Sequence, residues 1–489
     1  MRRLAVLLLS LVTTAVHAQS ETELPDIGNP AGAIITESDE YRIGKMIVKQ
    51  LRDEGAVIED PETSEYLQSI GARLAAQTPD GGRPFFFFPV RDGDINAFAL
   101  PGGFIGVNYG TVLATQNESE LASVMGHEIA HVTQRHIART IKAQSKQSLT
   151  AAAAILAAIL IGAAGGGGDA MQGGIMAAQG AAAQQQINFT RANEYEADRV
   201  GIGYVAAAGF DPQAMPTFFE TMGRRTGLAG AYVPEMIQSH PVTSNRIAES
   251  RSRAQQYDHV QVSESVSYSL IRERLRVITA PRETDLTKRY EREIKDQDGK
   301  ASLAQQYGES LALMQANRPL EAAKILDPLV QKYQTLTLLH IALAQAETQA
   351  GLSNDGLATF QRAMSLFPRN VPLAMRYAQA LMASGQARQA HQLLLDVFNN
   401  VAPTPDQIKL IDLAASAAGD MGDAYQYMSE YHIASGDLPL AIQQLELALA
   451  APNLTSVQRQ RFQARLDELR EAMFQSRNKR GGGRPEGSE

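Results

Sequence analysis

Two sets of apolar residues near the start of the chain have the spacing of helix faces. They are Ile43, Met46, Ile47 and Leu51, followed after a break at Pro61 by Leu67, Ile70 and Leu74. Side chains three or four residues apart share one face of a helix. The pattern therefore predicts two amphipathic helices within residues 39–76, each with one face in a protein core.

Between residues 83 and 110 the pattern changes to short aromatic and aliphatic runs, RPFFFFPVRDGDINAFALPGGFIGVNYG. Such residues favour strands, and the DGD and PGG sequences favour turns between them. We expect two or three short strands, with the phenylalanines at 85–88 in the core. The segment at 96–108 shortly precedes a histidine-rich helix, so an extended peptide could pair with the sheet edge there.

Residues 150–186 consist almost entirely of Ala, Gly, Gln and small aliphatic residues. The apolar run at 151–164 is short for a bilayer span, and glycines at 165–168 and 173–174 interrupt the segment. We expect a mobile, partly helical flap beside the histidine-rich helix. A transmembrane helix and a peripheral contact with the membrane surface are the alternatives.

From residue 298 to 475 the pattern is helical and repeats every 34 residues. Asn317, Gly351, Gly385 and Gly419 follow this interval, and five residues after each comes a small residue, namely Ala322, Gly356, Ala390 and Ala424. Tetratricopeptide helix hairpins have this period, and they stack into a solenoid whose concave face binds peptides or proteins. Gly436 and Ala441 fall half a period later, which indicates a displaced helix or a change of phase near 419.

The first residues, MRRLAVLLLSLVTTAVHAQS, have the pattern of a signal peptide (1–18) cleaved after Ala18. Removal of Arg2 and Arg3 leaves 43 basic and 53 acidic residues, a net charge of −10 that argues against a nucleic-acid partner. The chain has no cysteine, which fits a bacterial periplasm better than a disulfide-rich extracellular setting. The mature chain is too long for one core. We expect a domain at 19–255, linker helices at 256–297, the repeats, and a disordered polar tail at 476–489.

The stretch MGHEIAHVTQRH at 125–136 contains the metal-binding pattern H-E-x-x-H. His127 and His131 are four residues apart, so they point the same way from a helix and can hold one ion. In this pattern Glu128 is not a ligand but the general base that takes a proton from the attacking water. His136 would be about 140° further around the helix than His131. We therefore expect His136 to be a solvated or capping residue that does not share the metal.

The later stretch FTRANEYEADRVGIGYVAAAGFDP offers the missing third ligand. Glu194 and Asp198 are again four residues apart on a predicted helix. Glu194 would complete the open three-ligand site of a catalytic zinc ion, and Asp198 could accept a hydrogen bond from a ligand histidine. A surface helix with solvated acidic residues is the alternative.

Together, HEIAH and NEYEADRVG resemble the M48 family of zinc metallopeptidases. The resemblance implies a gluzincin-type α+β peptidase domain with Zn²⁺ as cofactor, followed here by an all-α tetratricopeptide solenoid. It also implies that Glu194, rather than Glu196, is the third metal ligand. SHPVTSNR at 239–246 resembles a further segment of that family, which indicates roles for His240 and Arg246.

The residues therefore predict a zinc metalloendopeptidase. His240 could fill the open fourth position, displace the catalytic water and keep the enzyme latent. Arg246 and His240 are also candidates for stabilising the oxyanion. With the signal peptide and the repeats, the resemblance implies a periplasmic enzyme that degrades misassembled outer-membrane β-barrel proteins, assists their assembly, and binds the assembly machinery through its repeats. The alternative is a repeat chaperone or scaffold with little proteolysis.

Overall fold

The computed structural model describes residues 36–79, 83–145, 180–228, 236, 239–257, 265–281, 283–297, 300–399 and 403–481. The expected signal peptide, most of the expected flap (150–179) with its membrane alternatives, and residues 482–489 lie outside these ranges. Within them, no helix combines the length and apolarity needed to cross a membrane.

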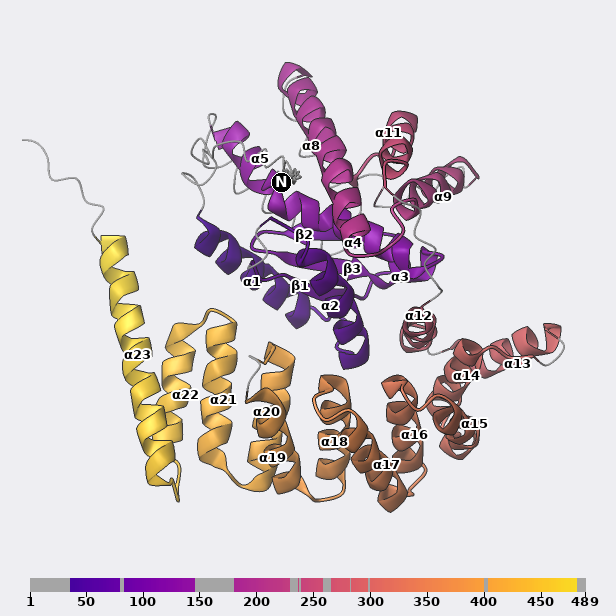
Figure 1. Cartoon of the computed structure of the whole chain (residues 1–489). Coiled ribbons are helices and arrows are strands. Elements are labelled where there is room, and N and C mark those ends of the chain that lie inside the picture. The colour runs from indigo at the N-terminus through magenta and orange to yellow at the C-terminus, as the bar shows by residue number, and fades with distance from the viewer. Residues whose placement is uncertain are drawn as a thin grey trace, which may run out of the picture.

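The first part of the chain combines a small sheet with surrounding helices (Figure 1). Its elements are α1 (Glu37–Asp53), α2 (Pro61–Ala75), β1 (Phe86–Val90), β2 (Ala97–Leu100), β3 (Phe104–Asn108), α3 (Tyr109–Ala114), α4 (Glu118–Thr133), α5 (His136–Ser145), α8 (Gly180–Ala207), α9 (Ala214–Leu228) and α11 (Ser244–Ala254). The two helices and the short strands expected between residues 39 and 110 are therefore confirmed. Helix α8 begins within the segment expected to be a flap.

The three strands form one sheet in the order β1, β3, β2. Strand β1 runs parallel to β3, whereas β2 is antiparallel to β3 and is joined to it by the PGG turn. Gly102 and Gly103 in this turn have φ angles of 80° and 86°, a region that side chains disfavour. The order leaves β2 at one edge of the sheet, next to α4.

The phenylalanine run fills a core on each face of the sheet. Phe85 and Phe87 belong to the main core, which residues of α2, α4 and α8 also form. Phe88 belongs to a smaller core against α1, and Phe86 packs against it. Successive strand residues point to opposite faces, so one run of aromatic residues serves both cores. The prediction that these residues are core residues is confirmed.

Helices α4 and α8 cross in close contact at a pair of glycines. A Cβ atom on Gly201 would lie 3.0 Å from the carbonyl oxygen of Gly126 and 3.1 Å from the Cα of His127. Because neither glycine has a side chain, the two backbones can approach this closely. The crossing places α8 directly against the part of α4 that carries the histidines.

The second part of the chain is all-helical and forms an arc below the first part (Figure 1). Its elements are α12 (Val266–Ile278), α13 (Leu286–Asp296), α14 (Leu303–Gln315), α15 (Pro319–Lys332), α16 (Thr337–Gln349), α17 (Ser353–Leu366), α18 (Val371–Ala383), α19 (Ala387–Phe398), α20 (Pro405–Ala418), α21 (Met421–Ala434), α22 (Leu438–Ala450) and α23 (Ser456–Gly481). Helix α23 thus includes residues 476–481, which we had expected to begin a disordered tail.

The 34-residue repeat corresponds to the turns within helix hairpins. Asn317, Gly351, Gly385 and Gly419 lie in these turns and have φ angles of 58°, 83°, 77° and 81°. Gly436, with a φ angle of 80°, occupies a further tight turn between α21 and α22. This extra turn accounts for the half-period spacing seen in the sequence. The small residues that follow the turns are buried between neighbouring helices.

Helix α12 belongs to two cores and joins the two parts of the molecule. Tyr268 and Ile271 pack in the main core of the first part. Leu270 and Val277, from the same helix, pack in the first core of the repeats together with Tyr290 of α13. Of the helices expected to be a linker at 256–297, α12 therefore packs on both sides, and α13 packs in the core of the repeats.

Candidate metal centre

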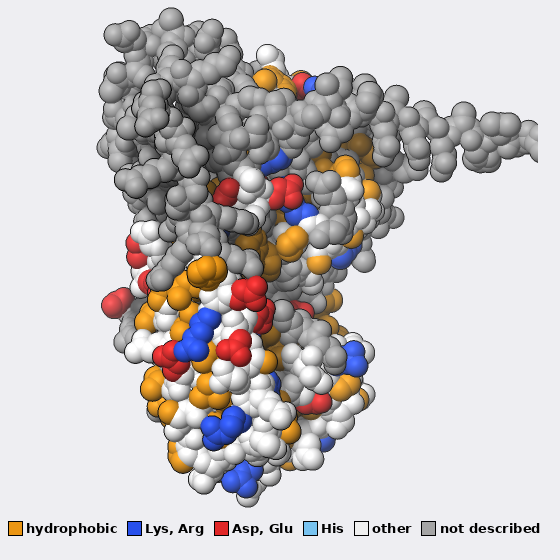
Figure 2. Space-filling model, turned by 90° about the vertical axis from the view of Figure 1, so that its left-hand side faces the viewer, with side chains coloured by type: hydrophobic (Ala, Val, Ile, Leu, Met, Phe, Trp, Pro, Cys, Tyr) orange, Lys and Arg blue, Asp and Glu red, His pale blue; other side chains and the backbone are white. Residues whose placement is uncertain are grey.

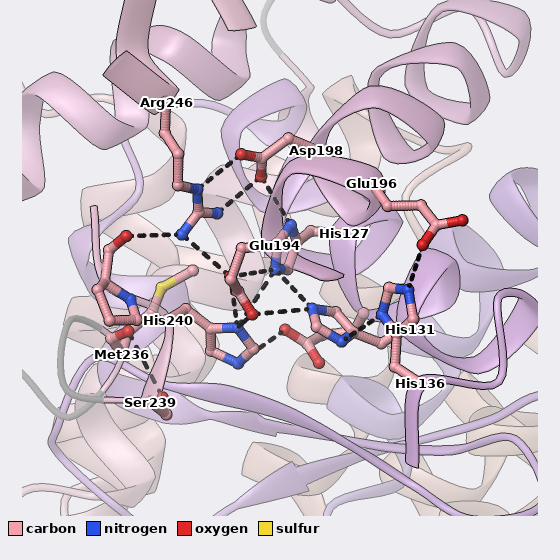
Figure 3. A network of polar contacts seen from close by, with 12 residues as sticks. His127, His131, His136, Glu194, Glu196, Asp198, Met236, Ser239, His240 and Arg246 are labelled. Atoms are coloured by element: carbon pink, nitrogen blue, oxygen red, sulfur yellow. Dashed lines mark hydrogen bonds and ion pairs between the residues drawn. The ribbon is translucent and has the colours of Figure 1, made fainter. Parts of the chain in front are cut away.

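Three segments of the first part bring four potential metal ligands together (Figure 3). His127 and His131 come from α4, Glu194 comes from α8, and His240 lies just before α11. One nitrogen or oxygen atom of each residue lies within 4.8 Å of those of the other three. The structure thus gathers in one place the four residues that the sequence analysis named as metal ligands.

The distances between these atoms fit a tetrahedral metal site. His127 Nε2 lies 3.0 Å from His131 Nε2, 3.4 Å from Glu194 Oε2 and 3.3 Å from His240 Nδ1. His240 Nδ1 lies 3.0 Å from both oxygens of Glu194. Ligand atoms about 2.1 Å from one tetrahedral zinc ion would be roughly 3.4 Å apart. Three imidazoles and a carboxylate therefore form a donor set that suits a divalent metal ion.

A buried ion pair supports the ligands from behind. Asp198 Oδ1 lies 3.0 Å from His127 Nδ1, the nitrogen that faces away from the cluster. Arg246 donates two hydrogen bonds of 2.7 Å to Asp198 and one of 2.9 Å to the carbonyl of Pro241, and its Nη1 lies 3.0 Å from Glu194 Oε2. These contacts keep the Arg246 guanidinium in the protein interior. The role of Arg246 in stabilising the oxyanion stays a prediction.

The charges of these groups depend on one another. Burial alone would lower the pKa of His127, but hydrogen bonds to Asp198 and Glu194 outweigh burial and raise this pKa to about 10. Burial alone would raise the pKa of Glu194, but His240 and His127 hold it well below its usual value. A metal ligand must be an unprotonated nitrogen, so metal binding at His127 would displace a proton, and metal affinity should fall as the pH falls.

Glu128 lies beside the ligands but is not one of the four. Its side chain is 1% exposed. In the described part of the chain, no donor forms a hydrogen bond with its Oε1. Burial raises the pKa of the Glu128 carboxyl, against the opposing effects of His240, His127 and the backbone N–H of Ala99 on β2. The nearest charged partner of this oxygen is Nε2 of His240, 3.7 Å away. A buried carboxylate oxygen without a hydrogen bond is unusual and is suited to accept a proton from a bound reactant.

The segment that carries His240 is attached to the edge of the sheet. The backbone N–H of His240 donates to the carbonyl of Met236, and the N–H of Met236 donates to the carbonyl of Ile95, just before β2. The His240 and His131 side chains are 12% and 13% exposed, against 1% for His127. Solvent therefore reaches the cluster from the side of His131 and His240.

His136 departs from its expected role. We expected a solvated or capping residue, but His136 is buried and its Nδ1 lies 3.0 Å from His131 Nδ1. The expectation assumed one continuous helix, whereas α4 ends at Thr133 and α5 begins at His136. The ring lies behind His131, on the side opposite the cluster. Its partner Glu196 also had no assigned role in the sequence analysis, because nothing in the sequence reveals this change of direction.

A second group of potential ligands lies in the repeats and consists of His391, Asp420 and Asp423. Its carboxylates already have protein partners. Arg461 forms an ion pair with Asp423, and the side-chain amide of Gln458 donates to both aspartates. These contacts explain the cluster as a structural connection between α19, α21 and α23.

Comparison with known proteins agrees with this fold and site. Residues 61–254 match peptidase family M48, and residues 347–410 match the tetratricopeptide repeat. The molecule is therefore a metallopeptidase that carries helical repeats.

Three relatives show how far the similarity extends. The beta-barrel assembly-enhancing protease of Escherichia coli (strain K12) is 33% identical over 462 residues, which cover 93% of this chain and 92% of that protein. The protein of the same name from Yersinia pestis is 32% identical over 476 residues, which cover 96% of this chain and 97% of that protein. The chain belongs to this family of M48 peptidases. The mitochondrial metalloendopeptidase OMA1 of Arabidopsis thaliana is 30% identical over 152 residues, 31% of this chain and 28% of that protein.

Proposed function

We propose that this chain is a zinc endopeptidase whose metal is held by His127, His131 and Glu194, with His240 at the fourth position in the resting enzyme. The observation that carries the proposal is the ligand cluster, in which separations of 3.0–3.4 Å between ligand atoms match the edges of a tetrahedral zinc site. A bound zinc ion supplies a Lewis acid that polarises the scissile carbonyl and makes water more acidic.

The protein itself supplies the general base, the orientation of a ligand histidine and a surface for the substrate. Glu128 takes the proton from the attacking water and passes it to the leaving amine. Asp198 accepts the Nδ1 proton of His127 and so keeps Nε2 free to bind metal. The edge strand β2 lies next to α4 and offers its outer side to an extended substrate chain.

The substrate class follows from the relatives and from the repeats. The relatives are named for enhancing β-barrel assembly, and the repeats provide a surface of the kind that binds proteins. We infer that the chain acts in the periplasm on unfolded or misassembled outer-membrane β-barrel proteins, and that the repeats contact their assembly machinery. Figure 2 supports a protein rather than a nucleic-acid partner, since Lys and Arg side chains on the described part of that face are scattered among acidic ones.

Digestion of casein and of an unfolded outer-membrane protein tests the proposal. Wild type should cleave both, and Glu128→Gln or a chelator should stop cleavage. Cleavage that survives both treatments would exclude a metallopeptidase mechanism at this site.

The closed ligand set favours a second candidate, a chaperone or scaffold with a structural metal. Structural zinc sites usually have four protein ligands, and His240 supplies the fourth here. In that case His240→Ala would lose metal affinity without gaining proteolysis. Under the enzyme proposal the same variant keeps its metal and becomes more active.

A further inference from the structure

A buried histidine outside the metal cluster contacts one of its members from behind. His136 is 3% exposed, and its Nδ1 lies 3.0 Å from Nδ1 of His131. Its other nitrogen, Nε2, lies 3.2 Å from Oε2 of Glu196 on α8. Arg139 donates to the same glutamate oxygen at 2.8 Å. A polar chain therefore runs from Glu196 through His136 to His131 (Figure 3).

A change of direction between α4 and α5 creates this contact. Between the two helices, Arg135 has a left-handed φ angle of 52°, a conformation that is unfavourable for a residue with a side chain. In an uninterrupted helix the side chains of His131 and His136 would point in directions about 140° apart. Here the two rings are in contact, with their centroids 4.8 Å apart. Such strained positions cluster at functional sites. Arg135 is also held by an ion pair of 2.7 Å with Glu40 of α1.

The two nitrogens of His131 have different surroundings. Nε2 faces the cluster and lies 3.0 Å from His127 Nε2 and 3.4 Å from Glu194 Oε1. If Nε2 binds metal, the ring proton must be on Nδ1, where it needs an acceptor. His136 Nδ1 can accept it only when the proton of His136 is on Nε2, and Glu196 accepts that proton in turn. The contacts then fix the ring proton of His131 on Nδ1 and that of His136 on Nε2.

We propose that His136 is a positioning residue that holds His131 in the tautomer and orientation required of a metal ligand. This proposal rests on the role of His131 in the proposed function. Helix α8 then supports both histidines of the HEIAH motif, His127 directly through Asp198 and His131 indirectly through Glu196. His136 is not itself a ligand, because it contacts the side of the His131 ring that faces away from the cluster.

Zinc affinity of the full chain, measured by competition with a chromophoric chelator, tests this role. His136→Leu removes the acceptor, and loss of such a partner typically lowers metal affinity about 10- to 100-fold. His136→Asn should restore most of the affinity, because Oδ1 of asparagine can take the place of Nδ1. His340→Leu is the matched control, since His340 is 5% exposed and bonds to a backbone carbonyl in the repeats. It should bind zinc as wild type does.

A second position keeps the test valid if His136→Leu does not fold. The Glu196 side chain is 35% exposed, so Glu196→Ala should fold and should weaken zinc binding by a smaller factor. Wild-type affinity in His136→Leu and Glu196→Ala overturns the proposal but not the proposed function. Equal losses in His136→Leu and His136→Asn indicate a packing role and also overturn it. Failure of the wild type to bind zinc would instead reject the proposed function itself.

Discussion

The position of Glu128 separates catalysis from metal binding. Its carboxyl is buried beside the ligands, and one of its oxygens has no hydrogen bond among the described residues. Glutamine has nearly the same volume but cannot act as a base. We expect Glu128→Gln to lose roughly 10²- to 10⁴-fold in peptidase activity and to keep its metal and helical content, as measured by elemental analysis and circular dichroism. Metal loss in this variant would contradict the division of roles.

His240 differs from the other ligands because it lies on neither α4 nor α8. Its Nδ1 lies 3.3 Å from His127 Nε2 and 3.0 Å from Glu194 Oε1, so in the proposed metal site it would take the position of the attacking water. We propose that it keeps the peptidase latent, and we expect His240→Ala to raise hydrolysis of an unstructured peptide several-fold while zinc content stays unchanged. His259→Ala, at a histidine that lies outside the described residues and nineteen residues beyond His240, should keep wild-type activity and serves as the comparison. Equal or lower turnover in His240→Ala would reject the latch.

The residues that could be predicted from sequence are those related by helix geometry. His127 and His131, like Glu194 and Asp198, are four residues apart, and the regular helix determines their relative direction. His136 could not be placed, because one left-handed residue at 135 redirects the chain. The partners of Arg246 could not be placed either, since its hydrogen bonds to Asp198 join positions 48 residues apart.

The crossing of α4 and α8 determines how far Glu194 lies from the histidines. Gly201 is two helical turns beyond Glu194, at the point where α8 touches Gly126. Gly201→Val would force the helices apart, at a cost of roughly 1–3 kcal/mol, and should lower both the melting temperature and the zinc affinity. Gly223→Val is the control, because a Cβ at Gly223 of α9 meets no atom within 4 Å. Equal zinc affinity in the two variants would show that the crossing does not control the site.

The strands and the helix hairpins could be predicted because their signals are local. Short aromatic and aliphatic runs and two turn sequences indicated β1, β2 and β3, and a 34-residue interval indicated the hairpins. The strand order could not be predicted, because β1 pairs with β3 across the intervening β2. The sequence likewise did not show that α12 packs in two cores at once.

Beyond α12, and apart from Leu338 of α16, which packs against the main core, the repeats contact the first part of the molecule through charges. Asp60 and Glu62, at the start of α2, each pair with Arg274 of α12 and with Arg376 of α18. The side chain of Lys45 on α1 also donates to a backbone carbonyl of α21. Among the described residues, no hydrophobic core joins α1 or α2 to the helices from α18 to α22. The repeat arc is therefore fixed by apolar packing at one end and by polar contacts along its length.

Because apolar packing holds only one end of the repeat arc, we predict that the rest of the arc can separate from α2 while α12 stays in place. Arg376→Met should release α18, since Asp60 and Glu62 remain neutralised by Arg274.

The chain lacks cysteine, so spin labels at Glu54→Cys and Leu413→Cys would report the distance between α1 and α20 without further changes. We expect a longer and broader distance distribution in Arg376→Met. Arg318→Met, which removes an exposed ion pair with Glu321 at the start of α15, should leave it unchanged. If a client protein bound to the repeats competes with the same contact, it would shift the arc towards the open arrangement. Identical distributions in Arg376→Met and wild type would mean that α12 alone holds the arc, and that these ion pairs do not restrain it.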